Sequence, residues 1–488
     1  MGYETRLLIG GERVEGEGAS LEVENPATEA VVATVGSASE SQLDRAVAAA
    51  DDARAEWAAM PAVDRAPLLH DIASKLRGRA VFFDVTATTE IGRPLTESTD
   101  EVEWCAACFD YYAEVGRSET GRVIPPIESS QFAVVVKEPH GVVGCIVPWN
   151  FPLLLLMWKL APALAAGNTA VCKPSELTPL STLALNDVFD DLPAGTVNLV
   201  AGAGEVGAGI SAHPGIDCLA FTGSVATGRK VGIAGISRGA RINLEMGGKD
   251  PFIVCGDLDS EAVRIAARGG AWSAYLNAGQ VCTSSERFYV MENVYDEYVS
   301  AFLEHTKSLV IGDPLDAKTD LGPMISATQR GKAVAQVEAA VAAGAELLTG
   351  GDDAGFATGH YLSPCVLTGV PEDSDLMTEE TFGPVAPILP VSDLEEAIAK
   401  ANGLDFGLGA NIYTRDLKTA ITCLKGVRAG SVWINDPLTD NDAGPFGGFK
   451  NSGIGRELGT EGLDAFREAK HVHMDSEIEV KDWWYPYG

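Results

Sequence analysis

Short apolar segments that alternate with helical sequence constrain the fold of this chain more than any other feature. From about residue 140, each apolar segment ends in Gly, Pro or Ser, and a helical pattern follows it. The segments are GVVGCIVP, NTAVCKPS, TVNLVAG, CLAFTGS and RINLEMGG. Strands that alternate with helices favour right-handed crossovers and a parallel sheet, whose strand ends form a ligand crevice.

A second alternating series predicts a second α/β domain. Its segments are DPFIVCGD, ERFYVMEN, APILPVSD, LGANIYTR and GSVWINDP. Residues 40–120 carry Ala-rich helical patterns, whereas QFAVVVKEP at 131–139 and HVHMDSEIEV at 471–480 alternate like an antiparallel strand pair. We therefore expect an α/β protein with two parallel-sheet domains and a small antiparallel arm.

Size and charge limit the possible partners. A chain of 488 residues exceeds the range of one growing core, so two or three domains are expected. A net charge of −33 disfavours nucleic acid or anionic lipid as the main partner.

The cysteines and the N-terminus bear on location. Nine scattered cysteines do not form a disulfide framework, which favours a reducing compartment. MGYETRLLIGGERV lacks the basic start and apolar core of a signal peptide, and prolines and Lys159 interrupt the apolar stretch 142–167. We expect a cytoplasmic protein without a membrane partner.

Two glycine-containing turns compete as the phosphate-binding site of a dinucleotide. Gly202, Gly204 and Gly207 form a G-x-G-x-x-G pattern, but it follows the third strand and lacks the acidic residue expected about 20 positions later. The next strand ends in FTGSVATG, where Gly223 and Ser224 open a helix whose N–H groups suit a pyrophosphate. The residues alone leave both turns open.

Two further patterns are better explained by packing. Cys105 and Cys108 resemble a C-x-x-C motif, but they lie within the helical sequence EVEWCAACFDYYAEV and indicate a buried helix face. His471 and His473 share one face of a strand, and two ligands do not make a metal site. No metal is predicted.

Three segments carry candidate catalytic groups. Cys282 follows a helical run through a flexible turn at 278–281, which would make its thiol reachable. Two prolines flank Asn150 in PWNFP, so its amide could donate to an oxyanion. Glu245 precedes a Gly-Gly turn and could swing as a general base. An inert core cysteine and a turn asparagine between prolines are the alternatives for the first two.

Together these segments resemble the aldehyde dehydrogenase superfamily over nearly the whole chain. The matching motifs, in order, are NPATEAVVATV, PWNFPLLLLMWKLAPALAAGNTAVCKPSE, FTGSVATG, LEMGGKDPFIV, AGQVCTSSER, EETFGPV and PFGGFKNSGIGRELG. Seven motifs in this order make a chance match negligible. The resemblance implies oxidation of an aldehyde to a carboxylic acid with NAD(P)+.

The resemblance implies catalytic roles at five positions. The Cys282 thiolate attacks the aldehyde, and the Asn150 amide with the Cys282 N–H stabilises the alkoxide. Loss of hydride leaves a thioester, which water activated by Glu245 hydrolyses. Lys159 and Glu457 match positions that relay the proton.

The resemblance also implies a dinucleotide site that uses FTGS in place of the Gly-rich fingerprint. Glu176 would accept both ribose hydroxyls and repel a 2′-phosphate, which favours NAD over NADP. The implied cofactor-binding residues are Lys173 and Glu176 at the adenosine ribose, Gly204 near the adenine, Ser224 at the pyrophosphate, Glu380 and Phe382 at the nicotinamide ribose, and Ile146, Trp149, Phe221 and Gly223 along the groove.

The resemblance divides the chain into three parts. Residues 1–120 and 140–250 would form the coenzyme domain, 251–451 the catalytic domain, and 121–139 with 467–488 an oligomerisation arm. Such arms pair between subunits, so a homodimer or homotetramer is expected. The aromatic tail KDWWYPYG is expected to pack on a neighbouring subunit, and a role in covering the pocket is the alternative.

The substrate pocket is expected to be apolar with an acidic rim. The matching lining positions are Phe151, Leu155, Trp158 and Phe446. The segment DPLTDNDAG places Asp436, Asp440 and Asp442 at the mouth, where they would repel an anion. A neutral aliphatic or aromatic aldehyde is the predicted substrate.

Two other functions remain alternatives. An acylating dehydrogenase would pass the thioester to coenzyme A, but such relatives lack the general-base glutamate that Glu245 provides here. A non-catalytic scaffold protein would not need Cys282, Asn150 and Glu245 together.

Overall fold

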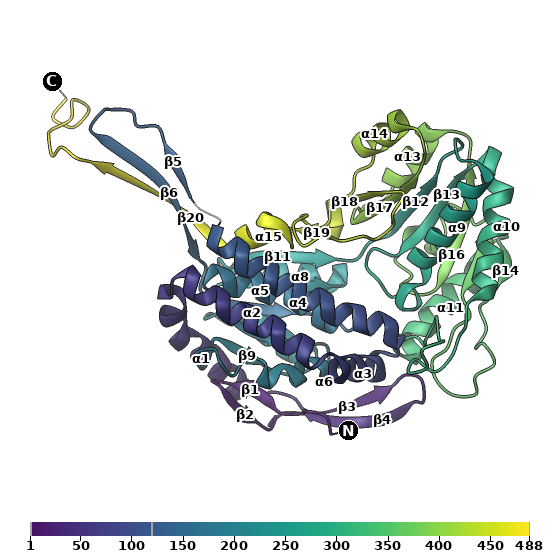
Figure 1. The fold of residues 1–488 in the computed structure, drawn as a ribbon, viewed down its shortest axis with the longest axis horizontal. Coiled ribbons are helices and arrows are strands. Elements are labelled where there is room, and N and C mark those ends of the chain that lie inside the picture. Colours follow the sequence, from purple (N-terminus) through teal and green to yellow (C-terminus); the bar gives the residue numbers. More distant parts are fainter. Residues whose placement is uncertain (1, 119–120, 488) are drawn as a thin grey trace.

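The computed structural model describes residues 2–118 and 121–487, and two large sheets dominate it (Figure 1). The first sheet has eight strands, in the spatial order β19 (Gly453–Ile454), β11 (Arg241–Met246), β10 (Cys218–Gly223), β7 (Val142–Ile146), β8 (Thr169–Lys173), β9 (Val197–Leu199), β1 (Leu7–Ile9) and β2 (Glu12–Val14). The five strands predicted from the first series form its parallel centre. Short antiparallel strands complete both edges.

The second sheet has seven strands and contains the second predicted series. Its spatial order is β14 (Glu346–Thr349), β15 (Cys365–Thr368), β16 (Val385–Val391), β13 (Ser285–Met291), β12 (Asp250–Val254), β17 (Gly409–Tyr413) and β18 (Ser431–Ile434). All neighbouring pairs are parallel except β14 with β15. The predicted α/β class with two parallel-strand sheets is confirmed.

Helices cover the two sheets, as Figure 1 shows. The α-helices are α1 (Glu40–Ala59), α2 (Ala62–Gly78), α3 (Ala80–Ile91), α4 (Leu95–Ser118), α5 (Pro152–Ala166), α6 (Leu180–Leu183), α7 (Gly204–Ala212), α8 (Val225–Ser237), α9 (Ser260–Tyr275), α10 (Glu292–Ser308), α11 (Ala327–Ala342), α12 (Asp375–Thr378), α13 (Leu394–Asn402), α14 (Leu417–Gly426) and α15 (Gly459–Asp464). The 3₁₀ turns are η1 (Ala184–Asp187), η2 (Leu276–Gly279) and η3 (Lys450–Ser452).

The helix α5 is buried along its whole length between the first sheet and α4. Pro152 starts it, at a position where the missing N–H costs no intrahelical bond. Cys105 and Cys108 lie on the buried face of α4, and the Cys108 thiol lies 3.7 Å from the Met157 carbonyl of α5. The prediction of a buried helix face is therefore confirmed. No described helix is long and apolar enough to cross a membrane.

Two small antiparallel sheets stand apart from the large ones. One pairs β3 (Ser20–Asn25) with β4 (Ala30–Gly36), and the other has the order β20 (Arg467–Asp475), β6 (Gln131–Pro139), β5 (Arg122–Ile124). The sheet of β5, β6 and β20 projects from the body as an arm in Figure 1. The prediction placed the last strand at 471–480, which is wrong at both ends. Asp475 pairs with Gln131, where β6 begins, so later residues have no partner strand.

Candidate functional site

The order of the first sheet fixes where a site can form. The chain builds β7, β8 and β9 in one direction and then returns to build β10 and β11 on the other side of β7. Crossovers on opposite faces leave a crevice at the carboxyl ends of β7 and β10. Asn150 follows β7, Ser224 follows β10, and Glu245 lies near the end of β11. Three predicted site residues thus come to the same edge of the sheet.

Two cavities meet at Cys282. The larger, of about 510 Å³, and the smaller, of about 190 Å³, share Asn150, Leu155 and Cys282 in their walls. Cys282 is half-buried, whereas the other eight cysteines are buried. Among the described cysteines, the partly exposed thiol of Cys282 therefore lies where the two cavities meet.

The turn before Cys282 is buried and hydrogen-bonded, unlike the loose turn that the sequence suggested. Asn277 and Ala278 adopt left-handed backbone conformations, with φ of 49° and 54°, and both are buried. The Gln280 side chain is fully buried, donates to the Asn277 carbonyl at 2.9 Å and accepts from the Ile325 N–H at 2.9 Å. Gly279 could not be replaced, because a Cβ there would lie 2.2 Å from the Gly383 carbonyl oxygen.

Asn150 lies beside this turn. Its Nδ2 donates to the Gln280 carbonyl at 3.0 Å, which uses one of the two amide protons. The Cys282 N–H donates to no backbone carbonyl in the described part of the chain. One amide proton and one backbone N–H are thus available near the thiol. Burial, with Asp250 and Glu380 nearby, raises the pKa of Cys282 well above its usual value.

Glu245 is buried outside the walls of both cavities. Its Oε2 accepts from the Gly448 N–H at 3.3 Å, and its Oε1 has no partner among the described residues. Gly447 leaves it room, because a Cβ there would approach Oε1 to 2.6 Å. Burial, reinforced by the Glu457 carboxylate, raises the pKa of Glu245 well above its usual value.

Lys159 and Glu457 form a buried ion pair behind the smaller cavity. Lys159 also donates to the Thr222 hydroxyl, which lies in the wall of that cavity. Burial raises the pKa of Glu457, and Lys159 opposes this shift. A chain of polar groups therefore leads from the cavity to a buried carboxylate close to Glu245.

The smaller cavity contains several residues predicted to bind a dinucleotide. Trp149 and Phe382 meet edge to face, with ring centroids 5.3 Å apart, and both lie in its wall with Gly223, Ser224 and Glu380. Ser224 caps α8 by accepting from the Thr227 N–H at 3.3 Å. Gly247 keeps the wall open, since a Cβ there would lie 2.4 Å from Glu380. Burial raises the pKa of Glu380 to about 7.

The other predicted cofactor residues lie outside both cavities. Lys173 ends β8 and Glu176 follows it, with Lys173 Nζ 3.9 Å from the half-exposed Glu176 carboxylate. Gly204 begins α7 in open space. Ile146 and Phe221 are register partners on β7 and β10 and are buried beside the crevice.

The larger cavity has the predicted apolar wall. Phe151, Leu155, Trp158 and Phe446 all line it, and the Trp158 and Phe446 ring centroids are 4.9 Å apart. Asp440 and Asp442 also line it, whereas Asp436 does not. The sequence did not indicate Trp104 and Trp272, which reach the cavity from α4 and α9.

Comparison with known proteins establishes the family. The profile of the aldehyde dehydrogenase family matches residues 14–472. The chain belongs to this family. It is 36% identical to an aldehyde dehydrogenase from Brucella melitensis biovar abortus 2308, with a TM-score of 0.94 and 98% of each chain covered. The resemblance predicted from the seven motifs is confirmed.

Two further solved structures differ in cofactor. A betaine aldehyde dehydrogenase from Staphylococcus aureus in complex with NAD+ is 33% identical, with a TM-score of 0.95 and 99% and 97% of the two chains covered. An NADP-dependent enzyme from E. coli is 34% identical, with a TM-score of 0.94 and 97% and 98% covered. Both overlap this member of the aldehyde dehydrogenase family over nearly its whole length.

A buried carboxylate from the AGQVCTSSER segment holds the loop with Glu380 and Phe382, a role that the sequence did not indicate. The Glu286 oxygens accept from the Thr381 and Phe382 N–H groups, each at 2.8 Å, and from Lys249 at 2.6 Å. Phe382 has a φ of 56°, an uncommon conformation that these bonds maintain. Only proximity in the fold connects Glu286 on β13 with this loop.

We expect Glu286→Gln to lower the free energy of unfolding by about 3–5 kcal/mol, because it leaves the buried Lys249 without a charged partner. Denaturant titration measures the change. Glu297→Gln is the matched control, since Glu297 pairs with Arg264 at the surface and its loss should cost less than about 1 kcal/mol. An equal loss in the free energy of unfolding for the two variants would contradict the proposed role of Glu286 in holding this loop.

Proposed function

We propose that this aldehyde dehydrogenase oxidises an aldehyde to the carboxylic acid with NAD(P)+, through a thioester on Cys282 that water hydrolyses. One observation carries the proposal. Cys282 is the half-buried thiol at the meeting point of two cavities, and the Asn150 amide lies in the walls of both. A thiol in this position can react with a carbonyl in one space while the other holds the electron acceptor.

The first step is attack of the Cys282 thiolate on the aldehyde carbon. The new C–S bond converts the carbonyl oxygen to an alkoxide, which the second Asn150 amide proton and the Cys282 N–H stabilise. Bonding of the first amide proton to Gln280 fixes the direction of the second. Because its environment raises the pKa of Cys282, the thiolate must be generated by transfer of the proton to a base.

The second step breaks the C–H bond of the adduct and reforms the carbonyl as a thioester. When bound, NAD(P)+ supplies the acceptor for the departing hydride. Glu245 then removes a proton from water as it attacks the thioester, and the C–S bond breaks to release the acid and the thiol. A rotation of its side chain past Gly447 would bring the Glu245 carboxylate from its buried position to the cavity.

Lys159 and Glu457 would carry the proton away from the site. Their ion pair is buried, and Lys159 reaches the cavity wall through Thr222. Burial raises the pKa values of both Glu245 and Glu457, which favours the protonated form of each carboxyl group over that of an exposed glutamate.

The residues around the smaller cavity fit a nicotinamide dinucleotide. Its aromatic wall suits a planar ring, and the free N–H groups at the start of α8 suit a pyrophosphate. Ser224 would hold the pyrophosphate, and Glu380 and Phe382 the nicotinamide ribose. Trp149 would line the groove, and Lys173 with Glu176 would hold the adenosine ribose. The similar Staphylococcus aureus structure contains NAD+, and the E. coli relative is NADP-dependent.

We expect Glu176 to favour NAD, because its carboxylate would repel a 2′-phosphate. Replacing Glu176 by Gln should raise the ratio of kcat/KM for NADP to that for NAD by at least about tenfold. Steady-state kinetics with both cofactors measure this ratio. Glu261→Gln, at an exposed acid that begins α9, should leave it unchanged. An unchanged ratio in the Glu176 variant would rule out charge repulsion there.

Glu245→Gln should separate the two halves of the reaction. We expect this variant to release about one NADH per active site in a rapid burst and then to stall, because the thioester forms but water is not activated. Stopped-flow absorbance measures the burst, and mass spectrometry of the quenched protein should find the acyl group on Cys282. Steady turnover without a burst would contradict the role of Glu245.

The same assay tests the two alternative functions. An acylating enzyme would require coenzyme A for turnover, whereas the presence of Glu245 leads us to expect free acid and an unchanged rate when coenzyme A is added. A scaffold protein would show the same NADH signal with Cys282→Ala as with the wild type. We expect Cys282→Ala to abolish the signal.

The cavity wall supports a neutral aliphatic or aromatic aldehyde. Phe151, Leu155, Trp158 and Phe446 provide apolar surface close to the thiol, and Asp440 and Asp442 would repel an anion. One observation favours a second candidate. Trp104, Trp158 and Trp272 share the cavity with these carboxylates, a combination that attracts an aldehyde with a distal cation.

A panel of aldehydes discriminates between these charge classes. We expect kcat/KM for hexanal and benzaldehyde to exceed that for succinic semialdehyde by at least about tenfold, since desolvated like charges repel. Asp440→Asn combined with Asp442→Asn should reduce this difference. A higher value for a trimethylammonium aldehyde would select the second candidate, and a higher value for the semialdehyde would contradict both.

The arm supports a homodimer or homotetramer. Its strands expose apolar side chains, including Phe132, Val136 and Met474, which another subunit would cover. In this proposal residues 1–120 and 140–250 form the coenzyme domain, 251–451 the catalytic domain, and 121–139 with 467–488 the arm.

A further inference from the structure

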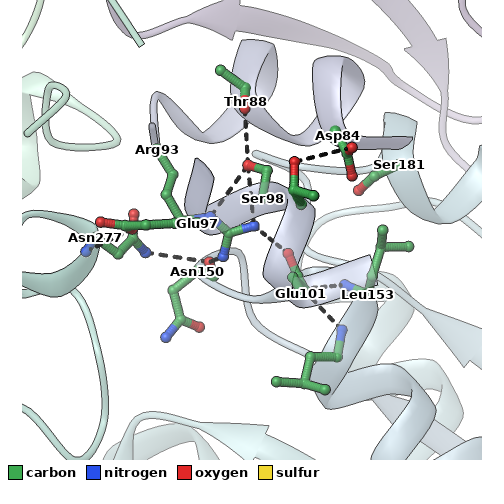
Figure 2. Close-up of polar contacts among 12 residues, drawn as sticks. Asp84, Thr88, Arg93, Glu97, Ser98, Glu101, Asn150, Leu153, Ser181 and Asn277 are labelled. Atoms are coloured by element: carbon green, nitrogen blue, oxygen red, sulfur yellow. Dashed lines mark hydrogen bonds and ion pairs between the residues drawn. The ribbon is translucent and has the colours of Figure 1, made fainter. Parts of the chain in front are cut away.

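A buried arginine lies next to the segment that carries the proposed oxyanion donor. Arg93 sits between α3 and α4, and only 1% of its surface is exposed. Its guanidinium forms an ion pair with Glu101 and donates to the Ser98 hydroxyl at 3.4 Å and the Asn150 carbonyl at 3.3 Å. Figure 2 shows Arg93 surrounded by these three groups. The guanidinium also lies 4.5 Å from the centre of the Phe151 ring.

The partner carboxylate fixes the same segment from the other side. Glu101 Oε1 accepts from the Leu153 and Leu154 N–H groups, at 3.1 and 2.9 Å (Figure 2). These N–H groups belong to the first turn of α5, and Phe151 at its N-cap makes no side-chain capping bond. The buried carboxylate therefore caps α5 from α4, and its charge complements the positive end of the helix.

The loop before Cys282 is held by a second carboxylate on the same helix. Glu97 lies four residues before Glu101, so both project from one face of α4. Its Oε2 accepts from the Asn277 N–H at 3.0 Å. The Asn277 side chain in turn donates to the Asn150 carbonyl at 3.3 Å, as Figure 2 shows.

These contacts converge on one peptide group. The Asn150 carbonyl accepts from both Arg93 and Asn277, while the Asn150 side chain donates to the Gln280 carbonyl. Two hydrogen bonds to its main-chain carbonyl and one from its side-chain amide leave Asn150 little freedom to rotate. Arg93, Glu97 and Glu101 line neither of the two cavities that contain the thiol, so their effect must be transmitted through Asn150 and the 277–281 turn.

We infer that Arg93 and Glu97 are positioning residues, which fix the oxyanion donor and the nucleophile loop relative to each other. The inference rests on the proposed function, since it assigns a purpose to a defined position of Asn150. Displacement of a catalytic group by about 1 Å can cost about 100-fold in rate without weakening substrate binding. The network therefore acts on the alkoxide-forming step rather than on binding.

The test uses Arg93→Lys, which keeps a cation beside Glu101 but cannot reach Ser98, Glu101 and the Asn150 carbonyl together. We expect the single-turnover rate of NADH formation to fall about 10- to 100-fold, with KM within about twofold of the wild type. The rate at which iodoacetamide alkylates Cys282 should change less than about twofold, because displacement of iodide by the thiolate forms no alkoxide.

A double-mutant cycle with Asn150→Ala separates positioning from general damage. If Arg93 acts through Asn150, the pair of substitutions should be no slower than Asn150→Ala alone. Arg65→Lys is the matched control, since Arg65 is another buried arginine that donates to main-chain carbonyls away from the site. Arg65→Lys should lower the midpoint temperature of thermal unfolding without slowing NADH formation more than about twofold.

Glu97 provides a second site for substitution. The fold should tolerate a change there better than at Arg93, because Glu97 is only partly buried. Glu97→Leu removes the acceptor for the Asn277 N–H and should slow the same step, whereas Glu97→Gln keeps a carbonyl oxygen and should restore it. A wild-type rate in both Arg93→Lys and Glu97→Leu, or losses that multiply with that of Asn150→Ala, would overturn the inference. Full activity of Asn150→Ala itself would instead overturn the proposed function.

Discussion

The hydrogen bond from the Asn150 side chain to the Gln280 carbonyl joins the two halves of the site. Asn150 follows β7 of the first sheet, and Gln280 precedes β13 of the second. Neither sheet alone contains both the amide and the thiol. Both cavities contain Cys282, and the smaller also contains Ser224, so the relative position of the sheets decides whether the two spaces meet at the thiol. The buried hydrogen bonds of Gln280 hold the 277–281 turn at this junction.

Buried charge is the second constraint on this structure. Lys159 with Glu457, Arg93 with Glu101, and Lys249 with Glu286 are ion pairs removed from solvent. Such pairs contribute little to the net stability of the fold, because the cost of desolvation offsets their attraction. They are best understood through the segments that they hold in place. One pair reaches the cavity through Thr222, one holds the start of α5, and one holds the loop with Glu380 and Phe382.

Much of the fold could be predicted from periodicity because strand and helix patterns are local. The strand at 131–139 has the predicted bounds, and all ten apolar segments became strands of the two large sheets. The prediction for 471–480 was wrong because the end of a strand depends on its partner, which begins only at Gln131. The edge strands β2, β14 and β19 are too short to give a periodic signal.

The sequence by itself determined the family, the α/β class and the proposed catalytic groups, because motifs such as AGQVCTSSER keep reactive residues in a local order. Only the tertiary structure decided how these groups are supported. Arg93 and Glu97 lie outside the seven motifs, and AGQVCTSSER contains Gln280 and Glu286 without indicating what they contact. Each of these four residues acts on a residue distant in the chain. The pKa values of Glu245 and Cys282 are raised for the same reason, since burial is a property of the folded surroundings and not of the neighbours in sequence.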